Sequence, residues 1–499
     1  MPFIRRAPRA GPALAFALAT ALAACSRSHF TEASASGART STANSPVATL
    51  DLEYEMPAVV GAAAHATASS LEAGKTVDLL WGTVTGGWVI EDYYHFRGKK
   101  YAEATRSLGQ FPVDASGRLN AGFVIPEDYG GVHEVVARIG GTAVAQGAIN
   151  VSQTFALSPA SGPVGTPIEL RATGLGWRTM ESTWVVNWDN QELGFVSAAG
   201  TRGSAVARFR ATGPAGDHIV KLYTGWQGLG YLNYEQSPVA ALPRPQFAFR
   251  TTPGAVRDAS YAEPYQPQAI PKSAAKDGAR LALTPTQGPV GTRAVLRGDG
   301  FAAGTSVQLV WETAVGSRVS DAGFTPQENV IGAITTDASG RFERTVTIPD
   351  DLGGLHRLAV HRGDDLVAST QFVIETSIVE IAPRSGPAGT PVSIHLKGVG
   401  WTEYDNIYVA TYDNAYMGYA CGFNSHGDVV INFTATGEPG PHLIDLYPGI
   451  YQGPSTEPQQ LYRLPQLTYA DDHPGNKIPA LRFIFDVTPP QRRTPTSTR

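Results

Sequence analysis

Four histidines occupy equivalent places along the chain, each two residues after a glycine and at the start of an apolar run. They are His133, His218, His356 and His442, in "GVHEVV", "GDHIV", "GLHRLAV" and "GPHLI". Four imidazoles could bind a transition metal if the fold gathered them. The sequence holds no HxxH, HExxH or cysteine–histidine cluster. We therefore predict a structural role for each histidine in its own domain, with no metal and no cofactor.

A recurring acidic dipeptide is the second candidate for chemistry. Asp189-Asn190 and Asp413-Asn414 are each followed, four residues after the Asn, by a glycine. Such oxygen atoms could bind calcium or act on a sugar. Both pairs also lie between alternating apolar runs, where Asp-Asn favours a tight hairpin turn. We predict the turn.

The motifs of common enzymes are missing. The chain has no GxSxG, no Walker A motif and no GxGxxG after a strand. Its one cysteine outside the first 25 residues, Cys421, aligns with Ser197 in an internal repeat, so no thiol recurs with a base. We predict that the protein is not an enzyme and has no catalytic residues.

Aromatic residues near the ends of two apolar strands are the remaining candidates for binding. They are Tyr223, Trp226, Tyr231, Tyr447 and Tyr451. Rings interleaved with Gly, Asn and Gln can form a platform for a sugar or a protein. The same rings can instead pack against the domain that carries them. Both alternatives stay open from the sequence.

An internal duplication shows what positions these residues. Shifting the chain by 224 residues aligns 157–225 with 381–449, and 25 of the 69 positions are identical. A second repeat interleaves with the first, since "AGKTVDLLWGT" matches "AGTSVQLVWET" and "DASGRLNAGFVIP" matches "DASGRFERTVTIP". The order is A-B-A-B, with about 100 residues in each domain, the size of an immunoglobulin-like sandwich. The predicted fold is therefore all-β, with about four tandem sandwiches.

A short turn is written three times: "SGPVGTP" at Ser161, "QGPVGTR" at Gln287 and "SGPAGTP" at Ser385. Proline fixes φ, and the second glycine of each copy permits a positive φ, so the pattern predicts strand, turn, strand. It resembles the IPT/TIG family of immunoglobulin-like domains, a family also found on bacterial surface proteins. The resemblance covers the first strands of three domains and implies a fold, with no particular ligand.

The first 25 residues carry arginines, then an apolar run, then "LAAC" ending at Cys25. This arrangement resembles a bacterial lipoprotein signal peptide. The resemblance implies that Cys25 is lipidated (palmitate and related acyl chains), that cleavage precedes it, and that a membrane holds the protein through this anchor. Ser26 favours the outer membrane in an organism that has two.

The predicted organisation follows from these patterns. It comprises a signal peptide (1–24), a tether (25–48), A1 (49–152), B1 (153–250), a linker (251–280), A2 (281–375), B2 (376–486) and a tail (487–499).

We predict a lipid-anchored cell-envelope protein for binding, adhesion or spacing, with an envelope protein or a polysaccharide as its partner. The net charge of −5 gives no basic footprint for nucleic acid. The alternatives are glycan capture by the B-domain loops and an enzyme of unrecognised type. A pocket uniting carboxylates or histidines across a domain junction would favour the enzyme.

Overall fold

The structure is a computed structural model. It describes residues 47–91, 95–226, 229–237, 239, 242–257, 260–265, 275–276, 278–317, 323–422, 426–450, 464–475 and 477–490. Cys25, the predicted tether before residue 47, most of the predicted tail and Tyr451 lie outside these residues. The chain divides into two units, Met1–Val47 and Ala48–Arg499, and every element below belongs to the second.

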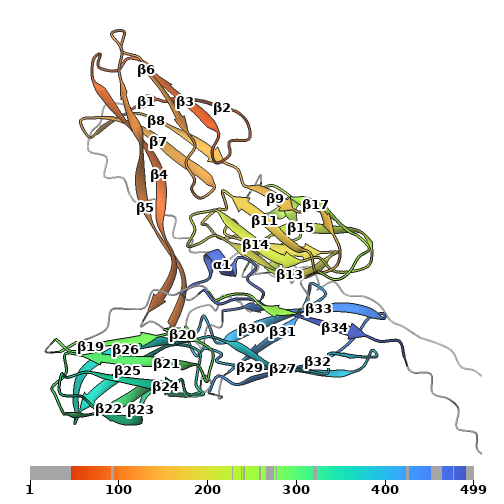
Figure 1. The fold of residues 1–499 in the computed structure, drawn as a ribbon. Helices are drawn as coiled ribbons and strands as arrows, with labels where there is room; N and C mark the ends of the chain where they lie inside the picture. Colours follow the sequence, from red (N-terminus) through yellow and green to blue (C-terminus); the bar gives the residue numbers. More distant parts are fainter. Residues whose placement is uncertain are drawn as a thin grey trace, which may run out of the picture. The chain divides into compact units, whose positions relative to one another are not determined.

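Sandwich A1 packs a five-stranded sheet (β1-β8-β7-β4-β5) on a three-stranded one (β2-β3-β6). Its strands are β1 (Ala48–Thr49), β2 (Asp51–Tyr54), β3 (Ala63–Ala68), β4 (Thr76–Glu91), β5 (His95–Pro112), β6 (Leu119–Val124), β7 (Gly131–Ile139) and β8 (Thr142–Val151). Trp81 is fully buried between the sheets. The hairpin β4–β5 is much longer than its neighbours, and Figure 1 shows it running out of the sandwich in brown.

Sandwich B1 repeats this plan with sheets β10-β17-β15-β12-β13 and β14-β11-β9. Its elements are β9 (Thr154–Ser158), β10 (Ser161–Gly162), β11 (Pro167–Thr173), β12 (Thr183–Trp188), β13 (Gln191–Ser197), β14 (Ala205–Arg210), β15 (Gly216–Trp226), β16 (Leu229–Gly230), the 3-10 turn η1 (Tyr234–Gln236) and β17 (Gln246–Thr251). The strand β16 pairs with the end of β15.

Sandwich A2 has sheets β20-β26-β25-β22-β23 and β19-β21-β24 around the buried Trp311. Its strands are β19 (Arg280–Thr284), β20 (Gln287–Gly288), β21 (Arg293–Asp299), β22 (Ser306–Gly316), β23 (Phe324–Thr335), β24 (Phe342–Thr347), β25 (Gly354–Arg362) and β26 (Asp365–Ile374).

Sandwich B2 has sheets β18-β34-β33-β30-β31, with β28 also on β34, and β27-β29-β32. Its elements are β27 (Ser377–Ala382), β28 (Ser385–Gly386), β29 (Pro391–Lys397), β30 (Ile407–Tyr412), β31 (Ala415–Cys421), β32 (Val429–Thr434), β33 (Gly440–Pro448), α1 (Tyr469–Asp472) and β34 (Leu481–Val487). The strand β18 (Tyr261–Ala262) comes from the segment predicted as a linker and pairs with β34. That part of the linker is thus an edge strand of B2.

The repeated turn closes the large sheet of three sandwiches. Its first two residues form the short strands β10, β20 and β28, which pair in parallel with the last strand of each sandwich. The threonine hydroxyl then donates to the proline carbonyl, at 2.6–2.7 Å in all three copies. The glycines Gly165, Gly291 and Gly389 have φ between 80° and 93°, as predicted. The motif therefore carries the chain from one sheet to the other.

The two Asp-Asn pairs form hairpin turns, which confirms that prediction. Asp189 and Asn190 have φ of 49° and 65°, and Asp413 and Asn414 have 49° and 63°. Two successive positive φ values define the type I′ turn, whose twist suits a two-residue hairpin. The turns join β12 to β13 and β30 to β31.

Each sandwich is immunoglobulin-like, with two mainly antiparallel sheets packed face to face around a core of inward-facing residues. The all-β prediction is confirmed. Of the helices within the described residues, none combines the length and the apolar composition that crossing a membrane requires.

Candidate functional site at the junction of three sandwiches

The four histidines serve their own sandwiches. In the A sandwiches both ring nitrogens of His133 and His356 lie 2.7–3.0 Å from backbone carbonyl oxygens. In the B sandwiches one nitrogen of His218 and His442 instead lies 2.5 Å from the carboxylate of the turn aspartate. Each ring also stacks on an aromatic ring of an adjoining strand. The described residues contain no cluster of three or more metal-ligating side chains.

The aromatic candidates do not form one platform. Tyr447 is fully buried and Tyr223 is 8 % exposed, so neither presents a ring to solvent. Tyr447 packs on Tyr469 and lies under the Arg482 guanidinium, which explains its burial. Tyr223 and Tyr447 thus pack within the protein, which is one of the two alternatives that the sequence left open.

The other candidates remain untested. Tyr231 is half-buried near the end of β16. Trp226 ends β15, but its side chain is outside the described part, as is the whole of Tyr451.

The structure points instead to the tip of the hairpin β4–β5. The strand β7 pairs with β4 only from Asp78 to Trp81, so beyond Trp81 the hairpin continues as a two-stranded ribbon. The described residues near the end of this ribbon contact both B sandwiches. The Trp88 Nε1 donates to the Asp472 carbonyl oxygen (2.5 Å), and Lys99 Nζ donates to Ser182 Oγ (2.7 Å).

A small apolar cluster binds the tip. Phe96 from β5, Phe195 from β13, and Ile450 and Leu464 from B2 are buried together, with Trp88 packed against them. The Phe96 N–H also donates to the Glu403 carboxylate at 2.6 Å. Three sandwiches thus meet in a core of their own, separate from the four main cores.

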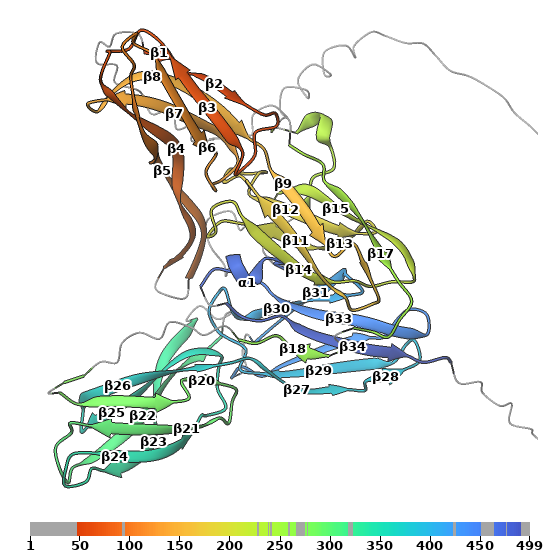
Figure 2. The same cartoon turned by 45° about the horizontal axis from the view of Figure 1, so that its top comes forward.

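The segment 464–475 of B2 lies on the other side of the junction from the hairpin β4–β5. The Pro465 carbonyl accepts from the Phe195 N–H, and the Leu467 N–H donates back to the Phe195 carbonyl. On its other side the Arg208 N–H donates to the Leu467 carbonyl. The segment therefore bridges the edge strands β13 and β14 of B1, and Figure 2 shows α1 beside β14.

Two buried ionisable residues follow in this segment. Asp472 is 1 % exposed, and its carboxylate accepts from Ser197 Oγ and from the Gly200 N–H, both at 2.6 Å. Burial raises the pKa of Asp472 above its usual value. Burial also lowers the pKa of His473 to about 3, so this ring is neutral at physiological pH. Its nitrogens face Gln466 Oε1 and the Tyr404 carbonyl oxygen.

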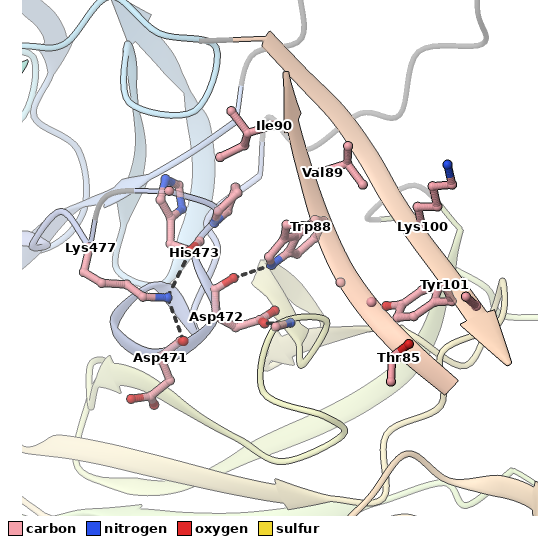
Figure 3. Close-up of a pocket in the computed structure, with 16 residues that line it drawn as sticks. Thr85, Trp88, Val89, Ile90, Lys100, Tyr101, Asp471, Asp472, His473 and Lys477 are labelled. Atoms are coloured by element: carbon pink, nitrogen blue, oxygen red, sulfur yellow. Dashed lines mark hydrogen bonds between the residues drawn. The ribbon is translucent and has the colours of Figure 1, made fainter. Parts of the chain in front are cut away.

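A groove of about 770 Å³ opens between the hairpin and this segment. We call it the junction groove. It is lined by residues 85–90, 100–102, 200, 471–475 and 477. Figure 3 shows Trp88 reaching from the hairpin to the backbone of the 471–475 segment, and Lys477 bonded to the same backbone from the segment's own side. The Lys477 Nζ donates to the Asp471 and His473 carbonyl oxygens at 2.7 and 3.0 Å.

The groove brings Asp471, Asp472 and His473 to a domain junction, the arrangement that would favour an enzyme. All three side chains already have partners within the protein. Asp471 is bound by Arg208 at 3.0 Å, and the other two are hydrogen-bonded within the protein. These interactions hold the wall of the groove in place. No local motif marks the groove, and sequence analysis missed it.

Comparison with known proteins assigns this chain to no family. No protein-family model and no curated protein matches this chain. Among solved structures, it is similar to the invasin described as a bacterial integrin-binding protein, at 10 % identity over 88 % of this chain and 79 % of that one, with a TM-score of 0.18. The ICAM-5 D1–D4 ectodomain fragment matches at 15 % identity over 81 % and 94 %, with a TM-score of 0.16.

Native E. coli alpha-2-macroglobulin matches at 10 % identity over 87 % of this chain, with a TM-score of 0.17. This chain spans only 30 % of that protein. TM-scores this low carry no argument about the fold, the domain arrangement or the activity of this chain.

Proposed function

We propose that the protein is a lipid-anchored envelope protein that binds a partner without catalysis. The observation that carries this proposal is the junction groove, which is open and whose ionisable walls are fixed by internal hydrogen bonds. A site that is shaped in advance loses little conformational entropy when a ligand binds. The recurring turn supports the further proposal that three of the sandwiches are IPT/TIG-like.

The anchor is proposed from the lipobox-like "LAAC" alone. Several acyl chains at Cys25 would hold the protein firmly, because each buried CH₂ contributes about 0.8 kcal/mol. We propose the outer membrane where the organism has one. The polar residues 26–46 would then act as a tether for the sandwiches.

Cys25→Ser tests the anchor. We expect the variant to accumulate as an uncleaved precursor and to lose incorporation of an alkyne-tagged fatty acid, because the thiol that accepts the lipid is gone. Labelling is read on gels after expression of the full chain, with Cys421→Ser as the matched control. Normal maturation and membrane retention of Cys25→Ser would show that the lipobox interpretation is wrong.

The binding role is tested with the purified chain on two probes, a glycan array and detergent-solubilised envelope protein from the same organism. Saturable binding to one of them, lost on unfolding, supports the proposal. Glycan binding that survives changes in the groove but is lost in Trp226→Ala or Tyr451→Ala would favour the alternative, capture by the B-domain loops. Binding to neither probe would favour the spacer role.

A further inference from the structure

We propose that the outer face of the small sheet of A1 (the A1 face, on β2, β3 and β6) binds the outer face of the small sheet of A2 (the A2 face, on β19, β21 and β24) in a second copy of this chain. The inference concerns self-association and does not depend on the envelope partner proposed above. It follows from three observations: both faces are exposed, their charges are opposite, and the A1 face has a hollow that suits an arginine side chain.

The A1 face carries negative charge. Asp51 and Glu53 lie on it, because they alternate along β2 with residues that pack in the core. Both are exposed, as is Glu55 just past the end of β2. Within the described part of the chain, no cation is hydrogen-bonded or ion-paired to any of these three carboxylates. At the far end of the face Arg118 interacts with Asp114, so it leaves the charge of β2 uncompensated.

A hollow of about 740 Å³ lies in the A1 face. It is open because Gly122 of β6, which pairs with His65, has no side chain; a Cβ there would meet only the His65 ring, at 3.7 Å. Glu53 and Val124 also line the hollow, and Val124 is 60 % exposed. An arginine fits such a place, since its apolar stem can cover the valine while the guanidinium binds the carboxylate.

The A2 face carries positive charge. Four exposed arginines stand against two exposed carboxylates: Arg280, Arg293, Arg297 and Arg341 against Asp299 and Glu343. Arg297 and Arg341 are paired with these carboxylates, at 2.8 and 2.9 Å. Neither Arg280 nor Arg293 has a bonded carboxylate among the described residues. A net positive charge therefore remains on the A2 face.

The internal repeat shows that the hollow belongs to A1. In the equivalent register of A2, Arg293 stands where A1 has Ala63, and Thr345 stands where A1 has Gly122. The A2 face is thus filled, and Arg293 projects from it into solvent. Because the chain exposes this arginine on one sandwich and a hollow with a carboxylate on the duplicate, a second copy supplies what the first one lacks.

The corresponding faces of the B sandwiches hold ion pairs of their own. In B1, Arg171 is paired with Glu169 at 2.6 Å. In B2, Lys397 is paired with Asp350 of A2 and with Asp428. Their charges are therefore compensated within the chain, which makes the A1 and A2 faces the ones that charge complementarity selects.

Self-association through these faces should be weak. Three strands of six residues span roughly 14 by 20 Å, which is well below the area of about 800 Å² per partner in a stable complex. Opposite charge then steers the encounter and fixes the register. Since the two faces differ, the contact is heterologous, and it either closes as a pair of copies or continues as an open array.

The test follows the sedimentation velocity of the chain from Ser26 onward, which keeps every described residue, over a range of protein concentrations. Glu53→Arg reverses a charge of the A1 face, and Arg293→Glu reverses one of the A2 face. The matched controls are Glu103→Arg and Arg362→Glu, which reverse exposed charges of the same two sandwiches outside these faces. Circular dichroism checks that each variant is folded.

We expect the sedimentation coefficient of the wild type and of both controls to rise with protein concentration. High salt should reduce this rise, because it screens the charges. Each reversal in a face should weaken self-association about tenfold or more. The double variant Glu53→Arg/Arg293→Glu should regain it, as should an equimolar mixture of the two single variants, because opposite charges again face each other.

A sedimentation coefficient of the wild type that does not change with concentration would overturn the inference. Failure of both the double variant and the mixture to regain association would show that the two faces do not contact each other. If Glu53→Arg instead lost binding to a basic envelope protein, or Arg293→Glu lost binding to an anionic glycan, without self-association, that face would belong to another partner and the inference would be wrong.

Discussion

At the residue scale, the four equivalent histidines have two different sets of hydrogen-bond partners. In A1 and A2 the imidazole lies between two backbone carbonyl oxygens. In B1 and B2 its Nδ1 is instead hydrogen-bonded to the carboxylate of the aspartate in the hairpin turn. The turn aspartate also accepts from the backbone N–H of the residue after the histidine. The Asp-Asn dipeptide thus closes a hairpin and ties it to the neighbouring strand.

His442 makes the stability of B2 depend on pH. The Asp413 carboxylate bonded to its Nδ1 raises the pKa of His442 above its usual 6.5. A raised native pKa stabilises the fold fully below about pH 6.5, and this stabilisation is lost as the pH rises through the native pKa. We expect the melting temperature of the wild type to fall over this range, and His442→Gln to remove that part of the slope.

Differential scanning calorimetry from about pH 5 to pH 8, the range in which histidine titrates, measures the effect. Asp413→Asn is the companion variant, since asparagine keeps the positive-φ turn but lacks the carboxylate. An unchanged pH slope in both variants would contradict the assignment.

At the element scale, glycines lock each A sandwich to the B sandwich that follows it. The N–H of Gly130 donates to Leu175 O, and at the duplicate junction the N–H of Gly353 donates to Val399 O. A Cβ on either glycine would lie about 2 Å from a backbone carbonyl oxygen, at 1.9 Å from Gly174 and 2.0 Å from Gly398. The A–B pair was therefore duplicated with its junction intact.

Gly130→Ala and Gly353→Ala should each force the two backbones apart. We expect the free energy of unfolding to fall by about 1–3 kcal/mol, which is typical when a methyl group is inserted where there is no space for it. Proteolysis near residues 130 or 353 should also become faster. Gly122→Ala is the control, because its nearest neighbour would be an ordinary contact at 3.7 Å. Urea unfolding compares the three variants, and equal stability of Gly130→Ala and Gly122→Ala would show that the junction is not tightly packed.

At the scale of the whole molecule, B1 and B2 share a core. Tyr447, Leu467, Tyr469 and Ala480 of the B2 side belong to the same apolar cluster as the interior of B1. Arg210 of β14 is 1 % exposed and bonds to Asp445 of β33, with Nη2–Oδ1 at 2.5 Å. Arg482 bonds to the same carboxylate and to Glu263. A buried interface therefore joins the two B sandwiches, and B2 also has a core cluster of its own.

Arg210→Ala should remove one of the two arginines that bond to the buried Asp445 carboxylate. Arg482 remains, but it also pairs with Glu263. Removing one member of a buried ion pair costs about 3–5 kcal/mol, so we expect both B sandwiches to melt together at a lower temperature. Arg250→Ala is the matched control, since its pair with Asp217 is exposed, and we expect its melting temperature to match the wild type. If calorimetry showed a lower melting temperature for B1 alone, that result would contradict a shared core.

Local rules determined much of this protein from sequence. The turn beginning at Ser161, Gln287 and Ser385, the Asp-Asn hairpins and the strand-start histidines were predictable, because φ preferences and the two-residue strand period act within a few residues. The similarity between segments of the chain then identified the repeated domains. A length of about 100 residues with runs of alternating apolar and polar residues favoured a sandwich for each domain.

Only the tertiary structure decided the junction groove and the burial of Tyr447. The groove combines residues 85–102 of one sandwich with Gly200 and 471–477 of two others, and no local pattern links them. From the sequence, Tyr447 could be an aromatic residue of an exposed loop. In the structure Tyr469 and Arg482 pack over its ring, so it is part of the core. Both outcomes depend on complementarity between surfaces distant along the chain, which neither alternation nor turn chemistry encodes.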